Sequence, residues 1–470
     1  MKNCVPSSAY SKFAAACLGA GALVAIAATP SLADEQFAPT GVVQLPDAQI
    51  LSAFDISFVS PENRTLAIAA SRVVGSGGPF GTIIIVNTDL NLVTKELHAN
   101  PPFVGDCTTP PARNNWSGPN GVIVIEKGFN ADVWAADGPV FNTACNQTSG
   151  LKTPSTVKVL DLRTGRTKAV IETGTGAGTK TPGIRRADEL CYNPESDVVL
   201  IANDDPLDNF ITFIGEDNYK VIQRIRFDGT DPNGANILAN GIEQCVFNPR
   251  DGKFYLNIPN TGAASLATPL PGVTLRISAR APFHVEKIFD FSKPPLSSTG
   301  CTGGAGLAVG PDHQLALSCG LIIDDRTGDP VAGGVLPSEG GADEIWYNSG
   351  DNHYFFADTG KVALGVVDAG PPPSADSLAA TAPGSHSVAA DPRRNQVYVP
   401  IRGNNGTVPP STGAGAGAIC SKAKDVFGNA GSDALGCIAI YTAPNDKDDC
   451  RAGGFSAFRR GRCPAGTANR

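Results

Sequence analysis

The most regular feature of the sequence is a repeated pair of short apolar segments with a tight polar turn between them. The turn carries Pro, Asn, Asp or Gly, and the second apolar segment follows it directly. Short apolar runs separated by such turn residues are typical of β-hairpins. The copies span residues 54–70, 121–137, 188–204, 242–260, 305–320, 343–358 and 386–401.

Several of these hairpins are followed by a third apolar segment, and some by a fourth, weaker one such as 168–174. A unit of four strands over about 40–50 residues is the blade of a β-propeller. The pattern therefore predicts an all-β fold, a seven-bladed β-propeller over residues 40–445. Six or eight blades are the alternatives, because the second copy is the faintest. The third segments are 82–91, 155–165, 321–328, 361–370 and 437–443.

The last repeat has little chain left for a fourth strand after residues 437–443. The segment TGVVQLP (40–46), ahead of the first hairpin, can fill that place. We therefore expect the N- and C-terminal strands to pair and close the ring, which removes the exposed sheet edge.

The N-terminus has the pattern of an export signal. Lys2 and Lys12 give it positive charge, residues 13–28 form a short apolar run, and SLA (31–33) resembles a cleavage site. The run is shorter than the roughly 20 residues of a membrane-spanning helix. We interpret residues 1–33 as a signal peptide rather than an anchor, and expect a periplasmic or secreted chain without a membrane span.

Composition narrows the classes of protein further. The chain has 53 Gly and 37 Pro in 470 residues, and charged residues are only 17% against a usual share of about 25%. Many turns and little charge argue against helical bundles, and 41% hydrophobic residues argue against disorder. The net charge of −8 lacks the excess of positive charge that is typical of nucleic-acid-binding proteins. We expect a monomer with a small-molecule or protein partner.

Ten cysteines remain once the signal is removed, an even number that predicts disulfides in an exported chain. Two of the ten, Cys191 and Cys245, lie on neighbouring inner strands, where they either meet across the third and fourth blades or stay as buried thiols. The local pairings we expect are Cys107–Cys145, Cys301–Cys319, Cys420–Cys437 and Cys450–Cys463. Residues 446–470 form an Arg-rich tail, which is either a basic contact arm or an end pinned by its disulfide.

Acidic residues recur at one place in the repeat. In a propeller, the start of each inner strand lies at one mouth of the central channel, where ligands commonly bind. The residues six positions before the turn are Asp55, Val122, Asp188, Glu243, Ala305, Asp343 and His386. Glu189 and Glu344 directly follow two of these positions, and Asn120 stands just ahead of the second inner strand. Arg186 can pair with the acids, bind an anion or form a plain loop salt bridge.

Converging carboxylates raise one another's pKa unless a cation neutralises them. Oxygen ligands suit a hard ion such as Ca²⁺, and a bound cation can activate water. Asp188 and Glu243 are then candidate catalytic carboxylates, with His386 as a candidate general base. The alternative is structural, because acids at strand starts also bind backbone amides in loops.

Several segments resemble exported bacterial YncE-like β-propeller proteins, and the resemblance covers nearly all of residues 40–445. It implies the propeller fold and a relationship to lactonase and surface-layer-type propellers. The phrase Pro119-Asn120-Gly121 is also similar to one in gluconolactonase-type propellers, where an Asn helps to hold a divalent ion. That resemblance implies Asn120 as a metal ligand beside Asp188, Glu243 and Asp343. The segments are GADEIWYNSGDNHYFFAD (341–358), GSHSVAADPRRNQVYVP (384–400), RADELCYNP (186–194) and PNGVIVIEKGFNADVWAADG (119–138).

The sequence thus predicts an exported propeller that acts as a binding or scaffold module, with a small ligand or divalent cation in an acidic funnel. A metal-dependent hydrolase acting on a lactone is the first alternative. A lyase with His386 as its base is the second.

Overall fold

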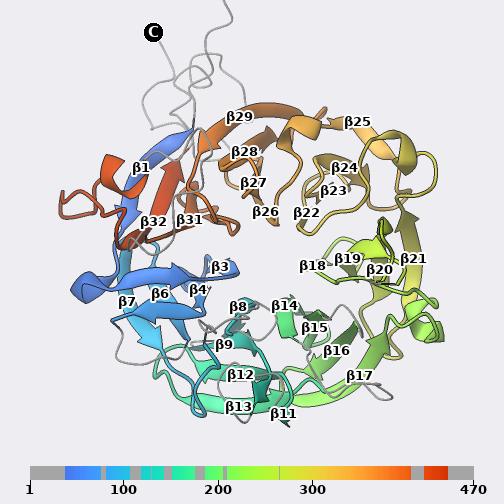
Figure 1. Ribbon diagram of the computed structural model, residues 1–470, viewed down its shortest axis with the longest axis horizontal. Coiled ribbons are helices and arrows are strands. Elements are labelled where there is room, and N and C mark those ends of the chain that lie inside the picture. The colour runs from blue at the N-terminus through green and yellow to red at the C-terminus, as the bar shows by residue number, and fades with distance from the viewer. Residues whose placement is uncertain are drawn as a thin grey trace, which may run out of the picture. The chain divides into compact units, whose positions relative to one another are not determined.

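Seven four-stranded antiparallel sheets follow one another around a central channel (Figure 1). The computed structural model describes residues 37–75, 81–105, 118–128, 130–141, 151–174, 186–204, 209–263, 265–403 and 418–442. The chain divides into Met1–Asp34 and Glu35–Arg470, and all the sheets belong to the second unit. The prediction of an all-β, seven-bladed propeller is confirmed.

Blades 1 to 4 each run from an inner strand at the channel to an outer strand at the rim. Blade 1 consists of β3 (Ser57–Ser60), β4 (Thr65–Ala70), β6 (Thr82–Asn87) and β7 (Leu92–Leu97). Blade 2 consists of β8 (Val122–Lys127), β9 (Asn130–Asp137), β12 (Thr156–Asp161) and β13 (Thr167–Glu172). Blade 3 consists of β14 (Arg186–Asn193), β15 (Val198–Asp204), β16 (Phe210–Gly215) and β17 (Lys220–Arg226). Blade 4 consists of β18 (Cys245–Asn248), β19 (Lys253–Thr261), β20 (Leu270–Ser278) and β21 (Val285–Asp290).

The remaining three blades continue the same order, and short elements decorate the loops. Blade 5 consists of β22 (Leu307–Val309), β23 (Gln314–Leu317), β24 (Leu321–Asp324) and β25 (Pro330–Val335). Blade 6 consists of β26 (Glu344–Asn348), β27 (His353–Asp358), β28 (Ala363–Asp368) and β29 (Ser374–Ala380). Blade 7 consists of β30 (Ala389–Asp391), β31 (Gln396–Arg402), β32 (Gly436–Thr442) and β1 (Ala38–Val43). The small pairs are β2 (Ile50–Ala53) with β5 (Arg72–Val74) and β10 (Val140–Phe141) with β11 (Leu151–Thr153). The 3₁₀ turns are η1 (Pro46–Ala48), η3 (Pro232–Gly234), η4 (Leu296–Ser298), η5 (Pro337–Glu339) and η6 (Cys420–Lys422).

The apolar pattern follows from how blades pack. Second strands such as β4 are buried at every position, because both faces of the sheet lie against a neighbouring blade. Outer strands such as β17 alternate between exposed and covered positions, because one face meets water. A buried apolar cluster fills each of the seven interfaces between blades, so the propeller has a divided core.

The inner hairpin turn is built the same way in several blades. Asn193, Asn248, Asn348 and Asp391 end their inner strands, and each side-chain oxygen accepts a hydrogen bond from the backbone N–H two residues later. Short polar side chains favour such turns, which explains the Asn-Pro and Asp-Pro pairs of the repeat. Just before the second strand, a residue in the left-handed region completes the turn, as at Gly252 (φ 66°).

The two ends of the chain complete blade 7. β1 pairs with β32 in antiparallel register from Ala38 opposite Thr442 to Val43 opposite Ile438. The expected ring closure is thereby confirmed, and the closing strand lies within two residues of its predicted start. The Cys420–Cys437 disulfide ties the insertion before β32 to that strand.

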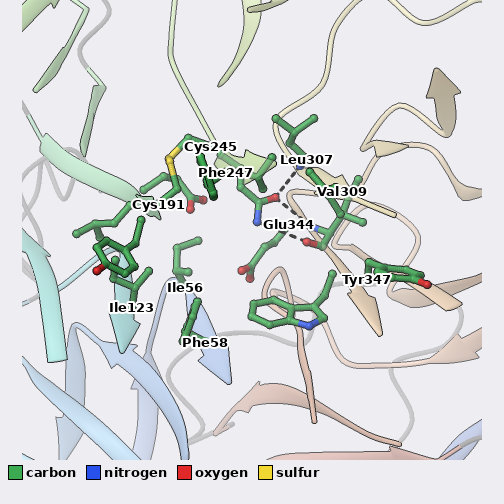
Figure 2. Close-up of a pocket in the computed structure, with 18 of the residues that line it drawn as sticks. Ile56, Phe58, Ile123, Cys191, Cys245, Phe247, Leu307, Val309, Glu344 and Tyr347 are labelled. Atoms are coloured by element: carbon green, nitrogen blue, oxygen red, sulfur yellow. Dashed lines mark hydrogen bonds between the residues drawn. A yellow bond between two sulfur atoms is a disulfide. The ribbon is translucent and has the colours of Figure 1, made fainter. Parts of the chain in front are cut away.

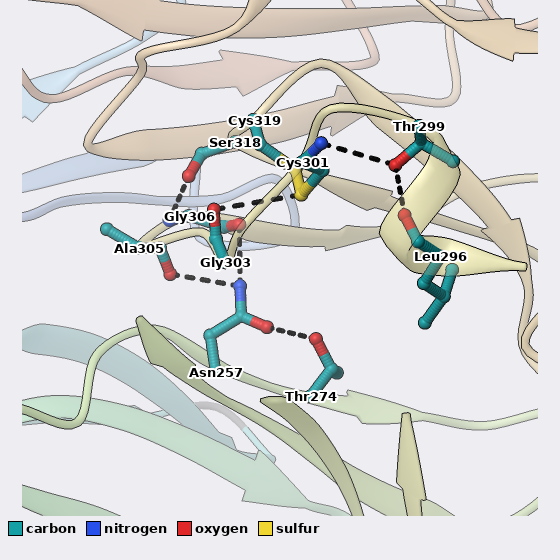
Figure 3. Close-up of a disulfide and its surroundings, with 10 residues drawn as sticks. All are labelled: Asn257, Thr274, Leu296, Thr299, Cys301, Gly303, Ala305, Gly306, Ser318 and Cys319. Atoms are coloured by element: carbon teal, nitrogen blue, oxygen red, sulfur yellow. Dashed lines mark hydrogen bonds between the residues drawn. A yellow bond between two sulfur atoms is a disulfide. The ribbon is translucent and has the colours of Figure 1, made fainter. Parts of the chain in front are cut away.

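Three of the expected disulfides are present. Besides Cys420–Cys437, Cys301–Cys319 staples the chain that enters blade 5 (Figure 3). Near it, the Asn257 amide of blade 4 donates to the Ala305 carbonyl (3.1 Å) and to the Gly306 carbonyl (2.8 Å), so the bond and the amide together fix the start of β22.

The third disulfide, Cys191–Cys245, joins the inner strands β14 and β18. The pairing across blades 3 and 4 is therefore confirmed, and the alternative of two buried thiols is wrong. The two side chains lie on facing sides of neighbouring strands, as the alternation of side chains along a strand requires.

Other sequence predictions lie outside the described residues. They are the signal peptide 1–33, the pairs Cys107–Cys145 and Cys450–Cys463, and the tail 446–470. Among the described residues, no helix has the length and apolar character needed to cross a membrane.

Candidate functional site

The acids picked out by the repeat occupy equivalent places in the fold. The backbone N–H groups of Asp55, Glu243 and Asp343 each donate to a carbonyl of the second strand in their own blade, at 2.8, 3.0 and 3.1 Å. This shared register brings the start of each inner strand to the same mouth of the channel. We call this end, with its carboxyl groups and their partners, the acidic mouth.

Arg186 is the central cation of the acidic mouth. Its guanidinium forms an ion pair with Asp188 on the same strand and lies 3.5 Å from Asp55 of blade 1 and 3.9 Å from Asp204 at the end of β15. Its side chain is only 13% exposed. Of the roles considered for Arg186, pairing with the acids is the one the structure shows, and it links blade 1 to blade 3 across the axis.

His386 is the second cation candidate at the acidic mouth. Its Nε2 lies 3.3 Å from Asp55 Oδ1, its Nδ1 lies 2.8 Å from the Gly384 carbonyl, and its ring stacks on Phe54 at 5.0 Å. Both nitrogens face acceptors, which favours the doubly protonated ring. Burial works to lower the pKa of His386, but the Asp55 carboxylate outweighs it and the pKa is raised.

Burial dominates the titration of most acids here. Desolvation raises the pKa of Asp188 well above its usual value, with Arg186 only partly opposing it. Desolvation and the charge of Asp204 do the same for Glu243. Asp55 is the exception, because the His386 hydrogen bond and the Arg186 charge together overcome desolvation and lower its pKa.

The remaining predicted ligands take different positions. Burial raises the pKa of Asp343, whose charge also acts on Asp188, so Asp343 belongs to the acidic mouth. The Asn120 side chain is buried and donates to the Ala187 carbonyl (3.1 Å), which ties blade 2 to blade 3. Among the described residues, no three His, Cys, Asp or Glu side chains are grouped closely enough to hold a metal ion. Metal binding by these residues stays a prediction.

The second pair of predicted acids, Glu189 and Glu344, lies one layer below the acidic mouth. Glu344 is 1% exposed, and its Oε2 accepts from Ser387 Oγ (2.6 Å) and from the Val388 N–H (3.0 Å). Glu189 is 7% exposed. Desolvation raises the pKa of both groups well above the usual value, and the charge of Glu344 adds to the shift at Glu189.

These two acids face a cavity of about 450 Å³ that occupies the channel between the inner strands of blades 1 to 6. Figure 2 shows Glu344 extending toward the open centre, with the Cys191–Cys245 disulfide in another part of the wall. The cavity reaches Pro194 and Pro249, at the turns that follow β14 and β18. It therefore runs from the layer of acids to the opposite end of the inner strands.

Sequence reasoning missed the aromatic lining of this cavity. The same alignment holds the signal, because the side chains stand two or three positions before the turn in their repeats. The aromatic residues are Phe58, Tyr192, Phe247, Trp346 and Tyr347.

Gln244, which follows Glu243, was also missed. Its Oε1 accepts hydrogen bonds from the N–H groups of Leu307 (2.7 Å) and Ile345 (3.4 Å).

Comparison with known proteins supports the architecture. No protein-family model and no curated protein sequence matches the chain. The chain is similar to a crystal structure of RRP9 WD40 repeats, at 8% identity and a TM-score of 0.50, over 87% of this chain and 100% of that one. It is also similar to a structure of U3-55K, at 8% identity and a TM-score of 0.49, over 86% and 99%. The first likeness shows the propeller fold alone.

Stability should depend on pH through the buried acids. A carboxyl group whose pKa is raised in the folded state contributes stability that is complete below its unfolded pKa of about 4, and this is lost as pH rises through the folded value. His386, with its raised pKa, acts in the same direction. Asp55 and several partly buried acids with lowered pKa values, such as Asp324, contribute stability that is lost below about pH 4. We therefore expect a higher melting temperature at pH 5.5 than at pH 8.

The measurement is thermal unfolding of the protein between pH 4 and pH 9. Glu189→Gln should flatten the decline above pH 5.5, because the amide does not titrate. Asp217→Asn, at an exposed turn, should leave the profile unchanged. A melting temperature that rises steadily from pH 5.5 to pH 8 would contradict the burial of these acids.

Proposed function

We propose that the protein is an exported binding module whose acidic mouth takes up a cation, either a divalent ion such as Ca²⁺ or a small positively charged molecule. The observation that carries the proposal is the surplus of carboxyl groups around the mouth. The acids are Asp55, Asp188, Asp204, Glu243 and Asp343. The cations near them in the described part of the chain are Arg186, His386 and Arg402.

A positively charged ligand would reduce the electrostatic repulsion among these acids. Their raised pKa values mean that burial opposes ionisation, and a bound cation would favour the ionised form. Carboxylate and amide oxygens are the ligands that Ca²⁺ prefers, which makes Asp188, Glu243, Asp343 and Asn120 the candidate ligand set.

Two observations support export. The N-terminal pattern of residues 1–33 is that of a signal peptide. The three disulfides suit an oxidising compartment such as the periplasm or the extracellular space. The resemblance to exported YncE-like propellers agrees with both.

The lyase alternative requires His386 to accept a proton. Both ring nitrogens of His386 face acceptors, and the pKa of His386 is raised. The geometry around His386 therefore favours binding over the lyase reaction as the proposed function.

Calcium should stabilise the protein. Saturation to about 100 times Kd adds about 2.7 kcal/mol to the free energy of unfolding, which corresponds to a rise in Tm of about 3 °C for a chain of this size. The measurement is thermal unfolding of the exported protein with CaCl₂ and with EDTA, together with elemental analysis of the purified sample.

Glu243→Gln should remove most of the calcium-dependent shift, and Asp217→Asn should keep it. Equal melting temperatures in CaCl₂ and EDTA, with no metal in the purified protein, would refute calcium as the ligand. A Glu243→Gln variant that keeps the full shift would place calcium away from the acidic mouth.

A further inference from the structure

The cavity below the acidic mouth combines two kinds of wall. Buried acids lie at its upper end, and half-buried aromatic side chains lie along its length. The Phe58 and Trp346 rings meet edge to face at 5.6 Å on one side. An apolar cavity with a few convergent polar groups is the usual form of a small-molecule site, and 450 Å³ suits a small organic ligand.

Glu189 is a polar cavity residue whose carboxyl group lacks a partner among the described residues. Its side chain is 93% buried, it lines the cavity, and no described residue forms a hydrogen bond or ion pair with its carboxyl group. A buried polar group without a partner carries a desolvation cost of about 1–3 kcal/mol, and more when it is charged. A ligand that donates hydrogen bonds to Glu189 would recover that cost.

Glu344 adds a second acceptor beside it. Both of its hydrogen bonds from blade 7 end on Oε2, so Oε1 is left for a ligand. The charged groups that act most strongly on Glu189 are Glu344 and Asp188, followed by Asp55 and Glu243, and all of them are acids. Arg186 and His386 are held by ion pairs within the acidic mouth above.

We propose that this cavity binds an organic ammonium ion, a primary or secondary amine with an apolar body, whose N–H groups donate to Glu189 and Glu344 while its body lies against Phe58 and Trp346. An ammonium group supplies both the positive charge and the hydrogen-bond donors that two carboxyl groups need. Aromatic faces attract the same charge and cover the apolar body.

A metal ion fits this cavity less well than an amine. Ca²⁺ requires six to eight oxygen ligands. The described part of the cavity wall offers two carboxyl groups among mostly apolar side chains.

The amine site rests on the proposed function for the general idea of a cationic ligand, but it uses other residues. The two can therefore fail separately.

The probe we choose is phenethylammonium chloride, measured against the exported protein by isothermal titration calorimetry at pH 7.5. Two matched compounds separate the contributions: 2-phenylethanol has the apolar body without the charge, and tetramethylammonium has the charge without N–H donors. We expect phenethylammonium to bind, and both controls to bind at least tenfold more weakly.

Glu189→Gln should weaken phenethylammonium binding by about 10- to 100-fold, the loss of one charged hydrogen bond. Trp346→Leu, which keeps both acids, should weaken it several-fold and serves if the first variant does not fold. Asp217→Asn should bind as the parent does. No binding at millimolar concentration, equal binding of 2-phenylethanol, or unchanged affinity in Glu189→Gln would each overturn the proposal.

The calcium response of Glu189→Gln separates this site from the acidic mouth. A variant that loses the amine and keeps the calcium shift supports two distinct sites. Amine binding without any calcium shift would leave the amine site standing and refute calcium at the mouth.

Discussion

Replacing Arg186 by methionine is expected to lower the free energy of unfolding by about 3–5 kcal/mol at pH 7.5, the range seen when one partner of a buried ion pair is removed. The guanidinium is the cation that Asp55, Asp188 and Asp204 share across blades 1 and 3. Methionine fills a similar space but leaves these acids without that charge. Urea-induced unfolding of the variant and the parent measures the difference.

The loss should shrink as the pH falls toward 5, because burial raises the pKa of Asp188 and Asp204, and these two acids need no counter-ion once they are protonated. Arg326→Met is the matched control, since Arg326 pairs with Asp324 on the surface and is 62% exposed. Such a pair contributes about 0–1 kcal/mol. If Arg186→Met cost no more than this control, the Arg186 network would not be a stabilising element of the fold.

The fold could be predicted from the sequence because its determinants are local and repeated. Each hairpin carries its own apolar segments, and its turn is specified by residues such as Asn193 and Gly252. The Cys191–Cys245 bond could be foreseen as one of two possibilities, because alternation along two strands fixes which side each cysteine faces, and the structure decides for the bond. Seven copies of one signal outweigh the weakness of any single copy.

The site could be predicted only in part. Counting back from the turn placed Asp55, Glu243 and Asp343 at one mouth, because strand register is fixed by the hairpin. The partners of Arg186 could not be chosen from the sequence, since Asp55 and Asp204 reach it from separate blades through side-chain conformations that packing decides. The aromatic residues two and three places before the turn look like ordinary core side chains in the sequence, so the cavity that they line was not predicted.

The hydrogen bonds of the buried acids explain why acids are tolerated inside the ring. Glu344 keeps hydrogen bonds from the blade 7 backbone and from Ser387, so its burial is partly offset. Glu189 has no such compensation among the described residues, although it stands at the equivalent position of its blade. Two repeats with one sequence pattern therefore differ in chemistry, and that difference marks where a ligand would contribute most.

Removal of the closing strand is expected to have the largest effect of any change considered. A chain that begins at Gln44 lacks β1, and with it the buried side chains of Phe37, Val42 and Val43. Their burial contributes about 4.5–9 kcal/mol, at about 1.5–3 kcal/mol each. The whole stability of a domain is about 5–15 kcal/mol, so this chain should be unfolded or marginally folded at 37 °C. Its exposed β32 edge should also promote aggregation.

A chain that begins at Glu35 is the control, because it keeps every described residue of β1 and should melt as the parent does. A synthetic peptide of residues 35–43 should restore the melting transition of the shortened chain by adding a strand to β32, as peptides do at open sheet edges. Circular dichroism melting and size-exclusion chromatography report both outcomes. A chain from Gln44 that stays monomeric with an unchanged melting temperature would mean that the ring holds without its closing strand, and that the seven apolar interfaces alone stabilise the propeller.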